Sequence, residues 1–145
     1  MRGIVFVALA AIAALLLAGG CFGPTVQKPA PEGKNCDYNN DCFVQSFLEC
    51  GKAHGTLVPD ENSSFYFQVM GNEGNKCKVY IQLIKAAGVP EFMNGMDAIC
   101  RMSPAELAQQ AQNKGAGMDI SKMDCQGPLY EAIKAAQSLQ GAPAK

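Results

Sequence analysis

The fold is decided by residues 65–83, which read FYFQV (65–69), GNEGN (71–75) and CKVYIQL (77–83) with single residues between them. Apolar and polar side chains alternate in the first and third parts, and a period of two residues predicts β-strands. The middle part is rich in Gly and Asn, which favours a hairpin of the longer-loop type. The sequence therefore predicts two antiparallel strands with an apolar inward face and a polar outward face.

Two further segments extend this hairpin into a small sheet. Residues 97–102 place Ala98, Cys100 and Met102 on one face, as a third strand would. Residues 56–58 are a shorter candidate for a fourth strand. If the third strand pairs beside the strand that contains Cys77, a disulfide between Cys77 and Cys100 becomes geometrically reasonable.

A helix is expected before the strands. Asn40 or Asp41 can cap its N-terminus, and Phe43 and Phe47 follow the i, i+4 spacing of a buried helical face. We expect this helix to end near residues 53–55.

Two helices are expected after the strands. The sequence Ser103-Pro104-Ala105-Glu106 has the signature of a capping box and predicts a helix to about Asn113. Gly127-Pro128 starts a last helix with apolar residues on one side, namely Leu129, Ile133 and Ala136. The predicted fold class is α+β: an N-terminal helix packed on a small antiparallel sheet of three or four strands, then two C-terminal helices, all stapled by disulfides.

The N-terminus has the pattern of an export signal. Residues 4–18 form an uninterrupted apolar run behind Met1-Arg2-Gly3, and the run ends in small residues. About 15 apolar residues at a rise of 1.5 Å cover roughly 22 Å, which is short of the ~30 Å hydrocarbon core. A signal peptide over residues 1–20 is therefore favoured over an uncleaved anchor helix.

The end of this leader, Leu17-Ala18-Gly19-Gly20-Cys21, resembles the lipobox of prokaryotic lipoprotein precursors. The departures are a single basic residue at the start and Gly immediately before the cysteine. The resemblance implies a lipid on Cys21, attachment to the cell membrane and a domain that faces the extracytoplasmic side; an ordinary secretory signal is the alternative. The rest of the chain resembles only small uncharacterised cysteine-containing lipoproteins of bacteria or archaea, and this implies no activity.

Cysteine parity agrees with the lipobox. The chain has seven cysteines, and a lipid on Cys21 leaves an even number suited to three disulfides in an oxidising compartment. No Cys-x-x-Cys pair is present, so neither a thioredoxin-like site nor a zinc ribbon has its usual spacing. Buried free thiols are the alternative. The six expected disulfide cysteines are Cys36, Cys42, Cys50, Cys77, Cys100 and Cys125.

The domain boundaries follow from these segments. After the signal peptide, residues 21–35 contain the lipidated cysteine and a stretch rich in Pro and Gly, which reads as an extended tether of up to ~40 Å. Residues 36–140 form the disulfide-bonded domain, and residues 141–145 form a disordered tail.

Composition excludes one class of function. The 145 residues are 48% hydrophobic and 17% charged, which is typical of a single globular domain. Twelve basic residues are scattered among 13 acidic ones. Because proteins that bind phosphate backbones usually present a basic face, we set nucleic-acid binding aside.

Few residues suggest catalysis or metal binding. His54 is the single histidine, and a cap at the helix C-terminus is its ordinary role. The loop carboxylates match no calcium-loop spacing and are expected to be solvated; they are Asp60, Glu61, Asp119 and Asp124. Soft thioethers could bind Cu(I), but core packing is the simpler role for the methionine-rich segment, which comprises Met93, Met96, Met102, Met118 and Met123.

Two surface features complete the candidates. Asn62-Ser63-Ser64 is a glycosylation sequon, which matters only if the host glycosylates exported proteins. Exposed tyrosines are common interface anchors, and Tyr66 and Tyr80 are predicted on the same outward side of the sheet. If the last helices cover that side, these tyrosines belong to a second core. Tyr38 and Tyr130 are the other two tyrosines.

The sequence favours a non-catalytic binding or structural module without a cofactor. Its partners would be the membrane, through the lipid on Cys21, and a surface or periplasmic protein. The alternative is an extracytoplasmic metal carrier or enzyme that uses His54, the loop carboxylates or the methionine-rich segment.

Overall fold

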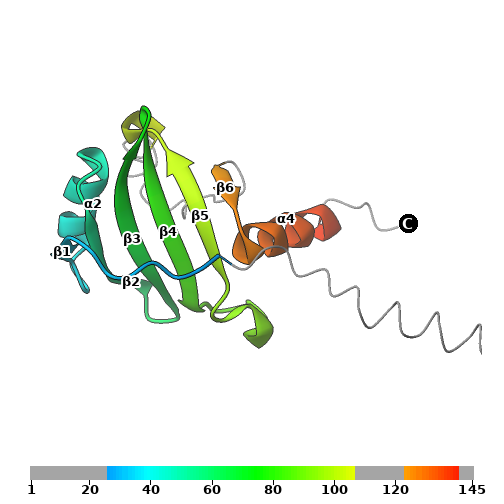
Figure 1. Cartoon of the computed structure of the whole chain (residues 1–145). Helices are drawn as coiled ribbons and strands as arrows, with labels where there is room; N and C mark the ends of the chain where they lie inside the picture. The colour runs from blue at the N-terminus through cyan, green and yellow to red at the C-terminus, as the bar shows by residue number, and fades with distance from the viewer. Residues whose placement is uncertain (1–25, 107–122, 141–145) are drawn as a thin grey trace, which may run out of the picture.

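The computed structural model describes residues 26–106 and 123–140, and its centre is a single six-stranded sheet (Figure 1). The strands lie in chain order, β1 to β6. β1 pairs with β2 in parallel and every other neighbouring pair is antiparallel, so the sheet is mixed. The strands are β1 (Lys34–Asn35), β2 (Ala53–Asp60), β3 (Ser63–Glu73), β4 (Lys76–Lys85), β5 (Asp97–Met102) and β6 (Asp124–Gln126).

The predicted fold class is therefore wrong. The sheet has six strands of mixed direction instead of three or four antiparallel ones. β1 and β6 span two and three residues, which is too short for any periodicity, and their pairing is decided by their neighbours in space. β2 extends over eight residues, although only 56–58 were expected.

One face of the sheet carries the core. Phe67 on β3 packs against Phe43 and Phe47 of α2 (Asn40–Leu48), with ring centroids 6.2 and 6.3 Å apart. Leu129, near the start of α4 (Pro128–Gln140), belongs to the same buried cluster. These helices shield the apolar face from water, because burial of apolar surface is the dominant favourable term in folding. A short 3-10 turn, η1 (Glu91–Met93), lies between β4 and β5.

Helix α2 is shorter than predicted at its C-terminus. Its cap is Asn39, whose Oδ1 accepts a hydrogen bond from the Cys42 amide at 3.0 Å, and it ends at Leu48. The chain then turns through Cys50, whose φ of +50° is left-handed and stops the helix. Residues 53–55, expected at the helix end, are the start of β2.

The central hairpin has the predicted strands with a tighter turn. Gly74 and Asn75 alone connect β3 to β4, and Gly74 has the positive φ, +70°, that such turns need. Because a register shift between Val69 and Gly71 absorbs an extra residue, the strands continue into the stretch that was expected to be loop. β5 has the predicted bounds, with Ala98, Cys100 and Met102 buried.

All six cysteines of the described residues form disulfides: Cys36–Cys42, Cys50–Cys77 and Cys100–Cys125. The predicted bridge between Cys77 and Cys100 is wrong. β4 and β5 are neighbours, but their register places Val79 opposite Cys100 and Met102 opposite Cys77. Cys100 instead faces Cys125 on β6, with Cα atoms 4.0 Å apart.

The start of the second predicted helix, at Ser103, is confirmed. The Ser103 amide donates to Glu106 Oε2 at 2.7 Å, and the Glu106 amide donates to Ser103 Oγ at 3.2 Å. This is the reciprocal pair of a capping box, and it holds the pKa of Glu106 below its usual value. The remainder of this helix lies outside the described residues, as do the signal peptide, Cys21 and the tail from residue 141.

Residues 26–33, which we name the strap, lie across the outward face of the sheet. Figure 1 shows them in blue, crossing β3 to β5 before β1. The strap belonged to the expected tether, yet Gln68 Nε2 on β3 donates to its Ala30 carbonyl at 2.7 Å. This part of the tether is therefore packed on the domain. Among the described helices, none is long and apolar enough to span a membrane.

Candidate functional site

The outward face has a covered half and an open half. In the covered half the strap passes over Tyr66, whose ring lies 4.2 Å from the Lys28 ammonium, a cation–π distance. The same Nζ donates to Gln82 Oε1 at 3.2 Å. At the far end of the strap, Glu32 and Lys52 form an ion pair of 2.6 Å.

Beneath the strap lies a small polar core. Tyr80 has no exposed surface, and its hydroxyl donates to Asp97 Oδ2 at 3.0 Å. Burial, and then the hydrogen bond to Asp97, raise the pKa of Tyr80 well above its ordinary value. The Tyr66 ring meets the Tyr80 ring edge to face at 6.2 Å. Lys28 of the strap therefore lies over the Tyr66 ring, and Tyr80 is buried beside that ring. The sequence left open an exposed tyrosine face or a cover by the last helices, and the element over Tyr66 is the strap.

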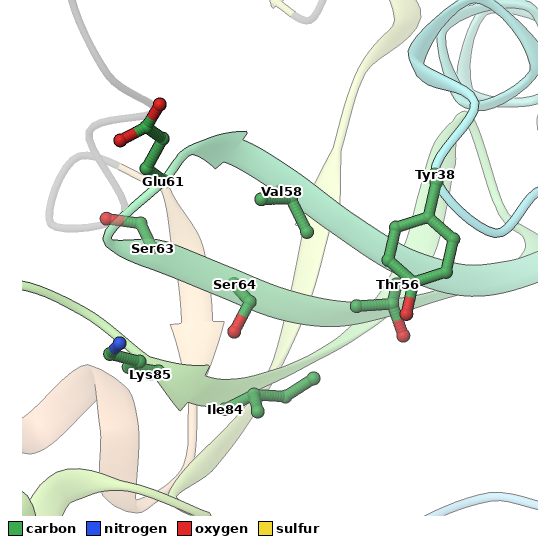
Figure 2. Close-up of a pocket in the computed structure, with 8 residues that line it drawn as sticks. All are labelled: Tyr38, Thr56, Val58, Glu61, Ser63, Ser64, Ile84 and Lys85. Carbon is green, nitrogen blue, oxygen red and sulfur yellow. The ribbon is translucent and has the colours of Figure 1, made fainter.

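The open half holds a pocket of about 380 Å³, which is in the range of small-ligand sites (Figure 2). Tyr38 and Thr56 stand at one end, and Glu61, Ser63 and Lys85 at the other. Its residues come from β2, β3, β4, the β2–β3 turn and the loop before α2; they are Tyr38, Thr56, Val58, Glu61, Ser63, Ser64, Ile84 and Lys85.

Tyr38 is the most exposed large hydrophobic side chain of the described residues, at 74%. Its φ of +58° lies in the left-handed region, which costs a bulky residue about 1–2 kcal/mol. Two hydrogen bonds to β2 hold this conformation: the Tyr38 amide donates to the Thr56 carbonyl at 2.8 Å, and the Thr56 amide donates to Asp37 Oδ1 at 2.7 Å. The Cys36–Cys42 disulfide closes the loop around it.

Apolar surface gathers beneath the Tyr38 ring. The aliphatic side chains of Val58 on β2 and Ile84 on β4 are 42% and 43% exposed. The hydroxyl groups of Thr56, Ser63 and Ser64 stand among them. The pocket therefore combines an aromatic wall, an aliphatic floor and groups that can bond to a polar ligand.

Asp37, the residue before Tyr38, also influences Tyr66 in the covered half. Burial is the first cause that raises the pKa of Tyr66, and the negative charge of Asp37 is the second. Thr56, which lines the pocket, is also paired with Tyr66 across β2 and β3, so the two halves adjoin on one face of the sheet.

The sequence-based candidates for catalysis are dispersed. His54 lies on β2, where its Nδ1 is 3.2 Å from the Glu32 carbonyl, so the predicted helix-cap role is wrong. Asp60 accepts from the Asn62 amide at 2.8 Å, and Asp124 pairs with Lys76 at 3.3 Å. Asp119 lies outside the described residues.

The methionines pack in the core. Met93, Met102 and Met123 are buried members of the main cluster, and Met96 packs against it. Met118 lies outside the described residues. Within residues 26–106 and 123–140, no group of three or more His, Cys, Asp or Glu side chains could hold a metal ion.

The two remaining candidates have clear positions. Asn62 is exposed in the turn between β2 and β3, as a glycosylated residue must be. Tyr130 on α4 packs partly against the core, and the Lys134 ammonium lies 5.2 Å from its ring.

Val58 and Ile84 line the pocket but were not predicted as site residues. A signal was present: Leu57-Val58 and Leu83-Ile84 are consecutive apolar pairs that interrupt the alternation of their strands. The second member of each pair points outward, because alternate residues of a strand face opposite sides.

Comparison of the chain with known protein families, with curated proteins and with solved structures gives no match.

Proposed function

We propose that this chain is a lipid-anchored extracytoplasmic lipoprotein, and that its domain is a non-catalytic module that binds a surface or periplasmic protein through the pocket beneath Tyr38. The observation that carries the binding role is the ring of Tyr38, which is 74% exposed and held in a left-handed conformation at the pocket rim. Fixed aromatic side chains beside apolar surface are typical anchors of protein interfaces.

The anchor is supported by cysteine usage. The three disulfides account for the six cysteines from Cys36 to Cys125, as an oxidising compartment favours, and Cys21 follows the lipobox-like residues. Cys21 precedes Val26 by five residues, which span at most roughly 18 Å. Because the strap is packed on the sheet, the domain would be held close to the membrane surface, nearer than a free tether would allow.

Intact-mass analysis of the processed protein tests the anchor. We expect a chain that begins at a lipid-modified Cys21, with a mass increase on reduction that corresponds to three disulfides. An unmodified Cys21, or a mature chain that begins elsewhere, would refute the anchor.

Photo-crosslinking in intact cells tests the binding role. A photoreactive phenylalanine analogue at position 38 should give a specific cross-linked protein. The matched control is the same analogue at Phe92, which is 72% exposed on η1 and does not line the pocket. Equal cross-linking patterns at the two positions would contradict a specific role for the pocket.

A further inference from the structure

The strap shows how this face binds a chain segment. Its sequence is Val26-Gln27-Lys28-Pro29-Ala30-Pro31-Glu32-Gly33, and it crosses the sheet without forming part of it until β1. Its contacts include a lysine over a tyrosine ring, side-chain groups bonded to main-chain carbonyls, and an ion pair at one end. The same lysine also bonds to Gln82. Extended segments that contain proline are suited to this mode, because they lose little entropy on binding.

The open pocket continues the same face with similar chemistry. Thr56 lies opposite Tyr66, and one outward position beyond Tyr66 and Gln82 on their strands lie Ser64 and Ile84. Tyr38 offers an exposed ring as Tyr66 does beneath Lys28, and the hydroxyl groups can bond to main-chain amides and carbonyls. The two charged groups of the pocket, Glu61 and Lys85, lie at the end opposite Tyr38 (Figure 2), so the Tyr38 end is left to a basic side chain.

We propose that the pocket binds an extended, proline-containing peptide segment of a partner protein, with a basic side chain placed at Tyr38 as Lys28 is placed at Tyr66. This inference rests on the proposed binding function and names the chemistry of the partner. Tyr38 is the aromatic contact, Val58 and Ile84 contact the proline or aliphatic side chains, and the three hydroxyl-bearing residues bond to the main chain of the segment.

The strap itself supplies the probe. An eight-residue peptide with the sequence VQKPAPEG and blocked ends is titrated into the full processed protein in detergent micelles, and two-dimensional NMR follows the backbone amides. We expect saturable shifts at Thr56, Val58, Ser64 and Ile84. The amides of Gln68 and Gln82 should remain unchanged, because the tethered strap has a high effective concentration over its own half of the face.

Matched variants test the contacts. Tyr38→Ala and Ile84→Ser should each weaken peptide binding by about fivefold or more, whereas Phe92→Ala should leave it unchanged. The peptide VQEPAPEG, in which Glu replaces Lys, should bind at least a few-fold more weakly. The substituted side chains are exposed, and the same spectra report whether each variant is folded.

The other outcomes overturn the inference. Shifts confined to Gln68 and Gln82, equal binding of the two peptides, or no saturable shifts would each refute a peptide site at Tyr38. Pocket shifts with an N-acetylglucosamine trimer and none with the peptides would assign the pocket to carbohydrate. A specific cross-link at position 38 without peptide binding would refute the peptide chemistry and leave the binding role intact, so the two failures are distinguishable.

Discussion

Single glycines show where the backbone tolerates no side chain. Gly127, between β6 and α4, has a φ of +126°, and a Cβ there would lie 2.8 Å from the Asp97 carbonyl oxygen and 3.0 Å from Ala98 Cα. Gly88 has a φ of +73°, but nothing lies within 4 Å of a Cβ at that position. A side chain at Gly88 would therefore meet backbone strain alone, whereas one at Gly127 would meet both strain and steric overlap.

We expect Gly88→Ala to lower the free energy of unfolding by about 1 kcal/mol, through backbone strain alone. Gly127→Ala should lower the free energy of unfolding by about 1–3 kcal/mol more than Gly88→Ala does, because β5 must also move. Urea denaturation of the two variants measures the difference. Equal losses would mean that the junction of β6 and α4 adjusts freely.

Tyr80 makes stability sensitive to alkaline pH. Its folded-state pKa is raised, so its contribution to stability is complete below the unfolded pKa, about 10, and is lost as the pH rises towards the folded value. We expect the free energy of unfolding to fall above about pH 10. In Tyr80→Phe this decline should be smaller, whereas the exposed Tyr38→Phe should behave like the parent chain in pH-dependent urea denaturation.

At the scale of elements, two disulfides connect the region of α2 to its surroundings. Cys50–Cys77 ties the end of α2 to β4 across a separation of 27 residues, while Cys36–Cys42 closes a loop of only 6. A disulfide that closes a longer loop removes more entropy from the unfolded chain.

Replacing Cys50 and Cys77 by alanine should lower the free energy of unfolding by about 3.5 kcal/mol, against about 2 kcal/mol for the Cys36 and Cys42 pair. The second change should also reduce cross-linking from position 38, because the loop that holds Tyr38 would open. Urea denaturation and the cross-linking assay measure the two effects. A larger loss of stability from the shorter loop would contradict this order.

At the scale of the whole molecule, the strap joins the two edges of the sheet. Val26 lies near Gly127 at the β6 edge, and Glu32 lies beside His54 and Lys52 at the β2 edge. Gln68 is buried, and its side-chain amide donates to the strap at the Ala30 carbonyl. The strap therefore supplies a hydrogen-bond partner for a buried polar group of the sheet.

Replacing residues 26–33 by a Gly-Ser segment of the same length should lower the free energy of unfolding by about 2–3 kcal/mol, through lost hydrogen bonds and the cation–π contact. Lys28→Ala alone should cost about 1 kcal/mol or less. Hydrogen exchange should show faster opening of the β3 and β4 amides in the first variant. Unchanged exchange and stability would mean that the strap is only a spacer.

The sequence alone determined the features that depend on near neighbours. The hairpin strands, β5, the capping box at Ser103 and the start of α4 follow from period, turn residues and capping chemistry within a few positions. The use of six cysteines in disulfides followed from parity. The bounds of α2 followed only in part, because the left-handed Cys50 that stops it has no local signature.

Tertiary structure alone decided the rest. The partners of the cysteines depend on strand register, which placed Cys125 opposite Cys100, and the two short edge strands exist only because β2 and β5 offer unpaired backbone groups. The candidate site has the same origin: Tyr38, Val58 and Ile84 are separated in the chain and meet only where three strands and one loop converge. The strap was predicted to be part of a free tether. Its contacts are with residues distant in sequence, and such contacts leave no periodic pattern in the chain.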